Sequence, residues 1–126
     1  MANPSTVGGT GAGTEVLRRF HQNDVTTSGI ELLNGLADHI YTIISIIVNN
    51  TTATETGLQM YMYPDATSGD VCYLTVGAAT KIPAYGTFVW SDKFVLTQTD
   101  SLYAECQSGG GNNFDIWVSY IDQTFA

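Results

Sequence analysis

The sequence predicts an all-β protein, a two-sheet antiparallel β-sandwich of jelly-roll or Ig-like type with eight or nine short strands and a flexible N-terminal arm. Three observations support this prediction. The chain has 126 residues, enough for one domain with one hydrophobic core. Charged residues make up only 13% of it, and the helix-favouring Lys, Arg and Glu are scarce beside Gly, Thr and Ser. Short apolar runs alternate with turn-forming residues, and no stretch longer than a turn has helical periodicity.

Residues 39–48 are the longest apolar run and the expected central strand. The run is dense in β-branched side chains, which fit a pleated, packed surface better than a helix. Strict alternation sorts them into two faces, with Ile40, Thr42, Ile44, Ile46 and Val48 on one and Tyr41, Ile43, Ser45 and Ile47 on the other. Because both faces are largely apolar, we expect burial on both sides. The run is too short for a membrane-spanning helix, which needs about 20 residues.

The other strands follow from alternation and from the turn residues between them. Two strands are expected before the central one, at 15–21 and 30–33, and Asn34-Gly35 is a strong tight-turn signal of the kind found in hairpins. Pro83 marks an edge segment, because proline cannot donate to a central ladder. The edge segment is expected at 81–86, and the strands after the central one are expected at 57–63, 71–76, 87–90, 94–96, 101–106 and 114–121.

Two of these strands have clearly distinct faces. In the strand at 57–63, the core side chains should be Leu58, Met60 and Met62. In the last strand, the residues that share one face are Phe114, Ile116, Val118 and Tyr120. Trp117 lies on the other face of this strand. We therefore expect one of the strand's two faces to be exposed or to lie at a subunit contact.

The chain divides into an arm and one domain. Residues 1–14 form a Gly/Thr-rich arm that buries too little surface to offset its own ordering entropy. Residues 15–126 form the single β-sandwich domain. The first residues have neither the basic nor the apolar region of a secretory signal.

The charge balance excludes two classes of partner. The net charge of −8 results from 12 acidic and 4 basic residues, whereas nucleic acids and anionic membranes are bound by basic patches. We therefore expect no nucleic-acid partner and no membrane partner. So few charges leave a surface rich in Thr, Ser, Asn, Gln, Tyr and apolar groups, which suits a protein that works in an assembly.

No motif indicates catalysis, and we predict no enzyme, no catalytic residues, no metal site and no cofactor. His21 and His39 each lie near an aspartate, but no serine sits in a Gly-x-Ser-x-Gly turn. A loop bracketed by Asp65 and Asp70 lacks the spacing of an EF-hand. Cysteine spacing does not indicate zinc either.

The two cysteines, Cys72 and Cys106, each lie within an expected strand. We expect them to be small, buried, hydrophobic side chains. A disulfide between neighbouring strands is the alternative.

Partner contacts are predicted at Arg18, Arg19 and Phe20 in the first strand. The two arginines carry half of the chain's positive charge. They either guard a sheet edge or dock a carboxylate-bearing partner through the bidentate guanidinium group. A sugar-stacking platform formed by Trp90, Trp117 and the tyrosines is an alternative to placing those rings in the core or at an interface.

The pattern of strands and turns over residues 15–121 resembles small virion proteins of tailed bacteriophages. The likeness lies in the segments Ile40–Asn50, Tyr63-Pro64-Asp65, Ile82-Pro83-Ala84, Phe88-Val89-Trp90, Lys93-Phe94-Val95-Leu96, Asp100-Ser101-Leu102 and Trp117-Val118-Ser119-Tyr120. It implies a non-enzymatic structural role, first as a head decoration (cement) protein that stabilises the capsid by bridging its subunits. A tail, collar or fibre-associated adaptor is the alternative, and a carbohydrate-binding module for host attachment is a further one.

The resemblance also implies partners and a location. The expected partners are the major capsid protein and further copies of the chain itself, in a homo-oligomer whose expected form is a trimer. The chain would be made in the host cytoplasm and would lie on the capsid exterior of the virion. We expect the arm, with Arg18 and Arg19, to make the capsid or subunit contacts, because an arm can add itself to a neighbour's sheet edge.

Overall fold

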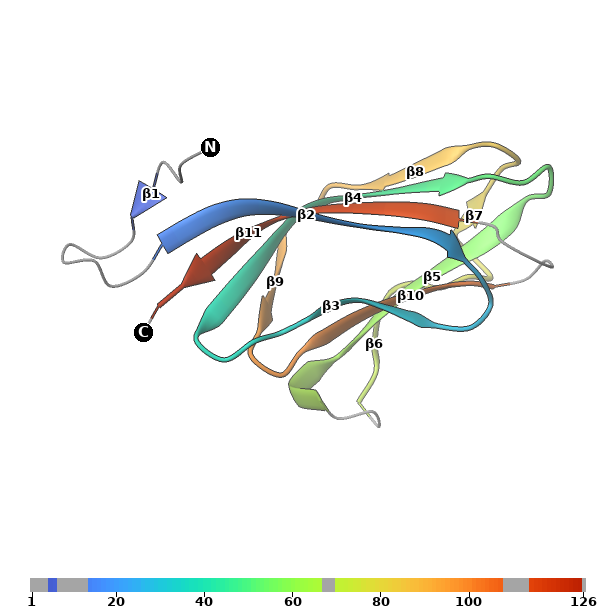
Figure 1. Ribbon diagram of the computed structural model, residues 1–126. Coiled ribbons are helices and arrows are strands. Elements are labelled where there is room, and N and C mark those ends of the chain that lie inside the picture. Colours follow the sequence, from blue (N-terminus) through green and yellow to red (C-terminus); the bar gives the residue numbers. More distant parts are fainter. Residues whose placement is uncertain (1–4, 7–13, 67–69, 108–113, 126) are drawn as a thin grey trace.

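The protein is described by a computed structural model for residues 5–6, 14–66, 70–107 and 114–125. In this part of the chain, strands stack in two antiparallel sheets around one core, which confirms the predicted β-sandwich (Figure 1). The elements are β1 (Ser5–Thr6), β2 (Thr14–Val25), β3 (Ile30–Asn34), β4 (His39–Asn50), β5 (Thr56–Tyr63), a short 3-10 turn η1 (Pro64–Ala66), β6 (Cys72–Thr75), β7 (Lys81–Ile82), β8 (Thr87–Trp90), β9 (Phe94–Thr97), β10 (Ser101–Cys106) and β11 (Phe114–Thr124).

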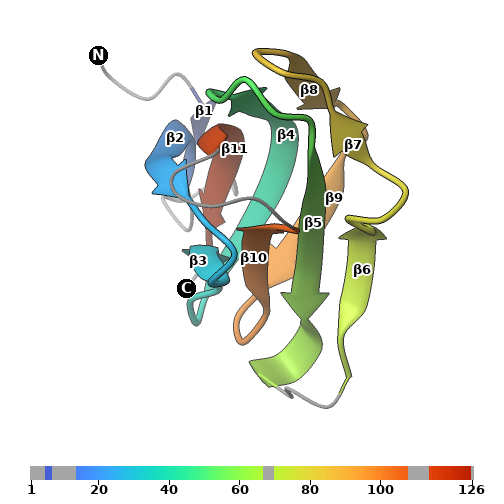
Figure 2. The same cartoon turned by 90° about the vertical axis from the view of Figure 1, so that its right-hand side faces the viewer.

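The strand order identifies a jelly roll. Sheet A has the order β1-β2-β11-β4-β8, with β9 also paired to β4, and sheet B has the order β3-β10-β5-β6, with β7 paired to β5. The chain changes sheet between β2, β3, β4 and β5 in turn, which is jelly-roll rather than Ig-like connectivity. Figure 2 shows β2 and β3 together at one side of the sandwich and β8 and β7 at the other.

One hydrophobic core lies between the two sheets. Its largest fully buried side chains are Phe114, Ile43, Ile46, Leu58, Met60, Ile82, Leu96, Leu102, Ile116, Val25, Val48 and Val118. The predicted inward faces of β5 and β11 are confirmed, since Met62 and Tyr120 pack against this core as well. Burying these side chains is the main force that holds the two sheets together.

The central strand β4 differs from its predicted pattern in two ways. Tyr41 and Ile43 face the core together with Ile46 and Val48, because the register with β11 shifts at this point. Such a bulge moves every later side chain to the opposite face, so strict alternation was wrong. Burial on both sides was also wrong, since Ile47 is 40% exposed. In the described part of the chain, the sandwich has two layers and nothing packs over the outer face of sheet A.

Asn34-Gly35 does not form the predicted tight hairpin turn. The strands on either side of it, β3 and β4, belong to different sheets and do not pair. The Gly35 N–H donates to the Asp100 carbonyl oxygen at 2.7 Å, and a Cβ at Gly35 would lie 2.3 Å from the Thr97 carbonyl oxygen. The glycine is required here because two backbone segments approach closely.

The cysteines are not joined in a disulfide, and only one matches the prediction. Cys106 is buried in the core, whereas Cys72 is exposed at the start of β6. Cys72 lies opposite Met62 on the core side of sheet B, but β6 is an edge strand, so no further strand covers its side chain.

Asn50, at the end of β4, is fully buried and ties three segments together. Its amide nitrogen lies 2.9 Å from the Thr54 carbonyl oxygen and 3.1 Å from each of the Ile82 and Pro83 carbonyl oxygens. Its amide oxygen accepts a hydrogen bond from the Thr52 N–H at 3.0 Å. The side chain therefore fixes the turn after β4 against the segment that follows β7.

Replacing Asn50 should cost much of the stability of the fold. Asn50→Ala leaves buried carbonyl and N–H groups without partners, so we expect the free energy of unfolding to fall by about 2–4 kcal/mol. Urea unfolding followed by circular dichroism measures this change. Asn49→Ala is the matched control, because Asn49 is only partly buried and accepts one hydrogen bond, from Thr87; its cost should stay below about 1 kcal/mol. Equal costs for the two variants would contradict this role of Asn50.

Candidate functional site

The outer face of sheet A carries a band of exposed apolar and aromatic side chains. Trp117 on β11 lies opposite His21 on β2 and opposite Ile47 on β4, and Ile47 lies opposite Val89 on β8. Together these strands present a surface that we call the tryptophan face, made of Leu17, Arg19, His21, Ile47, Val89, Val95 and Trp117. A solvent-facing sheet is normally polar on its outer side, so this band indicates a contact surface.

Trp117 is the centre of the tryptophan face. The Arg19 guanidinium carbon lies 4.8 Å from the centre of the indole, and the His21 ring stacks on the indole at 5.7 Å between centroids. Arg19 Nη1 lies 2.9 Å from His21 Nδ1. The indole also separates two shallow hollows of about 530 and 280 Å³, one beside Arg19 and the other beside His21. Trp and Arg held in one geometry lose little side-chain entropy on binding, which favours a protein contact.

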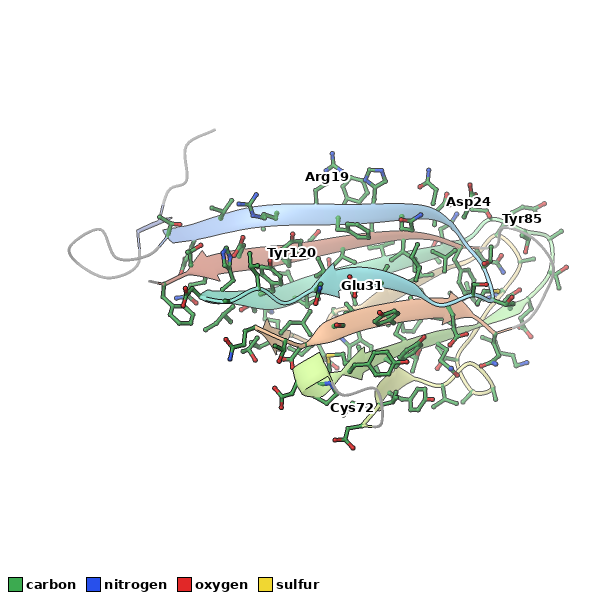
Figure 3. The ribbon with its side chains drawn as sticks, turned by 60° about the horizontal axis from the view of Figure 1, so that its bottom comes forward. Arg19, Asp24, Glu31, Cys72, Tyr85 and Tyr120 are labelled. Carbon is green, nitrogen blue, oxygen red and sulfur yellow. The ribbon has the colours of Figure 1, made fainter. Side chains whose placement is uncertain are left out.

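The structure separates the three predicted partner-binding residues. Arg19 belongs to the tryptophan face and points away from the sandwich (Figure 3). Phe20 packs against the core, opposite Val118. Arg18 faces the same way as Phe20, and its Nε donates to Asp122 at 2.9 Å. Successive side chains of a strand alternate between its faces, so three consecutive residues cannot share one contact surface.

Arg18 belongs to an ionic cluster around the buried Asp122. This carboxylate is only 4% exposed and also lies 2.6 Å from His39 Nδ1. His39 is thus paired with an aspartate of β11 rather than with its sequence neighbour Asp38. Burial and the nearby Asp122 raise the pKa of Tyr41, which contacts His39 edge-on. Because both of its oxygens are engaged, Asp122 serves to hold β2, β4 and β11 together.

The outer face of sheet B carries four tyrosines in mutual contact. Tyr61 lies 5.6 Å from Tyr103 in a stacked arrangement, 5.8 Å from Tyr73 and 5.5 Å from Tyr63, measured between ring centroids. Sequence alternation had placed Tyr61 and Tyr63 on this side of β5, but only the pairing of β5 with β10 and β6 brings in the other two rings. We call this surface, with the carboxylates that border it, the tyrosine face.

Two glutamates border the tyrosine face. Glu31 on β3 accepts a hydrogen bond from the Tyr103 hydroxyl at 3.3 Å, and Glu105 on β10 accepts one from the Gln59 amide at 3.1 Å. Burial raises the pKa of Tyr61 above its usual range, and Glu105 and Tyr63 raise it further. Burial raises the pKa of Tyr103 as well, with Glu31 adding to the effect.

The raised tyrosine pKa values predict how stability depends on alkaline pH. The folded protein holds these protons above pH 10, where an unfolded tyrosine begins to lose its proton. The free energy of unfolding should therefore be unaffected by tyrosine below about pH 10 and should fall as the pH rises further. The slope of this fall reports how many more protons the folded state holds than the unfolded state. Tyr61→Phe should reduce that number by up to about one proton per molecule and make the slope shallower, measured by urea unfolding from pH 8 to pH 11.5. Equal slopes for the variant and the parent would contradict the assignment.

Trp90 and Trp117 do not form a common sugar platform. Trp90 packs against the core from β8, and its Nε1 donates to the Asp92 carbonyl oxygen at 2.8 Å. Trp117 lies on the opposite side of sheet A and is 42% exposed, as its alternation on β11 predicted. The tyrosine face provides a larger group of aromatic rings instead.

The edge of sheet A at β2 is open along most of its length. Within the described residues, β1 pairs only with Thr14 and Glu15 at the start of this strand. The later backbone groups of β2 on this side are therefore available to a further strand. Most of the predicted arm, residues 1–4 and 7–13, lies outside the described part of the chain.

Neither a metal site nor a membrane span is found in the described residues. No three His, Cys, Asp or Glu side chains there come close enough to hold a metal ion. The described part of the chain also contains no helix of the length and apolarity needed to cross a membrane.

Comparison with known proteins supports the fold. No protein-family model and no curated protein sequence matches the chain. A solved structure of Bacillus endospore appendages, a family of disulfide-linked pili, is 12% identical with a TM-score of 0.50, over 99% of this chain and 94% of that one. A chain of infectious bursal disease virus, Gx strain, is 14% identical with a TM-score of 0.51, over 91% of this chain and 33% of that one. At these identities the likeness establishes a shared β-sandwich, found both in an appendage and in a virus particle.

Proposed function

We propose that this protein is a non-enzymatic structural component of a tailed-phage virion, a decoration protein that binds the capsid exterior and bridges its subunits. The observation that carries the proposal is the exposure of apolar and aromatic side chains on the tryptophan face, which is unusual for a free monomer. A role in an assembled particle gives these side chains a partner. The shared fold with a virus chain and an appendage agrees with such a role.

The open edge of β2 is the proposed site of the capsid contact. An extended segment that pairs with this edge gains main-chain hydrogen bonds without needing particular side chains. The Gly/Thr-rich arm before β2 can make the reciprocal contact with a neighbour's edge. Arg19 is exposed beside this edge and can pair with a carboxylate of a neighbouring subunit.

A carbohydrate-binding module is the second candidate function, favoured by the tyrosine face. Tyr73 is 56% exposed and adjoins Tyr61, which contacts the other two rings, with two carboxylates at the border. Rings of this kind can stack on the apolar faces of sugars, while the carboxylates accept hydrogen bonds from sugar hydroxyls.

Quantitative mass spectrometry of purified virions tests the proposal. The measured quantity is the copy number of this chain relative to the major capsid protein. We expect a ratio near one or a simple fraction of it, because a decoration protein follows the capsid lattice. A few tens of copies per particle would instead favour the tail, collar or fibre adaptor. Absence from washed particles would overturn the virion role, and glycan-array binding would then favour the carbohydrate-binding module.

A further inference from the structure

The two outer faces of the sandwich carry opposite charges at the same side of the molecule. On the tryptophan face, the cationic group is Arg19 on the edge strand β2, where it contacts His21, and Asp115 lies farther in, on β11 beside Trp117. On the tyrosine face, Glu31 lies on the edge strand β3. Figure 2 shows β2 and β3 at the same side of the sandwich, and Figure 3 shows Arg19 and Glu31 at similar positions along the length of the strands.

We propose that the partner of the tryptophan face is the tyrosine face of a second copy of this chain. In this contact the copies stack in the same orientation, so that β2 of one lies over β3 of the next. The inference rests on the homo-oligomer that the proposed function includes and gives that oligomer its interface. The capsid contact along the β2 edge stays free, because it uses backbone groups at the side of the sheet.

Stacking in this orientation matches the two faces strand by strand. Both faces run in the same direction across the sandwich, from β2 to β8 on one and from β3 to β6 on the other. The two rows of facing side chains are His21–Trp117–Ile47–Val89 and Glu31–Tyr103–Tyr61–Tyr73. The β2 and β3 ends of the rows meet, where Arg19 lies next to His21 and can pair with Glu31, and the aromatic and aliphatic parts of the rows cover each other.

Charge complementarity favours this contact over pairing of like faces. Two tyrosine faces would bring together Glu31 and Glu105 of both copies, whereas two tryptophan faces would leave both tyrosine faces without a partner. In a chain with a net charge of −8, further contact between carboxylates would add to the repulsion between copies. Trp, Tyr and Arg are also the residues that contribute most often to binding energy at protein interfaces.

The contact joins two different surfaces, so it is heterologous. A stack of copies keeps one free tryptophan face at one end and one free tyrosine face at the other. Such contacts generate a ring where the rotation between copies closes, and a filament where it does not. Copies stacked in the same orientation have no rotation between them, so this contact gives an open stack rather than the closed trimer that the resemblance implies.

Reversing one charge on each face tests the inference by sedimentation velocity over a range of concentrations. We expect the parent chain to self-associate, and R19E and E31R each to weaken association by about three- to thirty-fold. Mixing the two variants should restore association, because each variant then offers the face that the other requires. The double variant R19E/E31R should associate alone. Far-UV circular dichroism and urea unfolding verify that all variants are folded.

Each other outcome contradicts the inference. A parent chain that stays monomeric at every concentration would overturn it, as would association that R19E weakens but E31R does not, since that pattern indicates contact between two tryptophan faces. Failure of mixing to restore association would overturn it as well. The virion copy number is independent of these measurements. The virion role can therefore be supported when this interface is contradicted, and the interface can be supported when the virion role is contradicted.

The aromatic part of the contact has its own test. Trp117→Ala should weaken self-association by about thirty-fold or more, because a partly exposed tryptophan at the middle of an interface contributes strongly to binding. Leu36→Ala is the matched control, since Leu36 is an exposed apolar residue in the connection between β3 and β4. Equal effects of the two variants would contradict the interface.

Discussion

The pairing of β4 with β11 at the middle of sheet A determines most of the other features of this protein. It runs from Phe114 opposite Asn50 to Thr124 opposite His39, with a single register shift. On the inner side, it places the β-branched residues of β4 and the apolar residues of β11 into one core. At its far end, it brings Asp122 against His39, and on the outer side it exposes Trp117 beside Ile47. The core, the ionic cluster and the tryptophan face therefore depend on one strand register.

A two-layer sandwich can bury only one face of each sheet. In this chain the outer positions are also occupied by large apolar and aromatic side chains, on both sheets. Their exposure reduces the solubility of the isolated chain, and a partner that covers them would remove that cost. Function is thus expected on the faces and the open edge of the sandwich rather than in a cleft. Asn50 supports these faces from inside the molecule. Its buried hydrogen bonds make the sandwich that carries the faces rigid.

The fold could be predicted from the sequence because its signals are local. Alternation in β5 and β11, and β-branched residues in β4, indicate strands and their inner faces without any knowledge of partners. Other features depend on which strand lies beside which. The bulge that puts Ile43 and Ile46 on one face, the partner of His39 and the contact among the four tyrosines all require the sheet order. The same reasoning failed at Asn34-Gly35, where a hairpin signal lies in a crossover between sheets and glycine is needed for close backbone approach.

The central claim is that the outer faces of the sandwich are contact surfaces in an assembly. Hydroxyl-radical footprinting of the chain in its native particle, compared with the dissociated chain, tests this claim directly. Trp117 and Tyr73 should be modified far more slowly in the particle, whereas Leu36 should react equally in both states. Equal modification of Trp117 and Tyr73 in the two states would contradict the claim, because it would mean that both faces stay exposed to solvent.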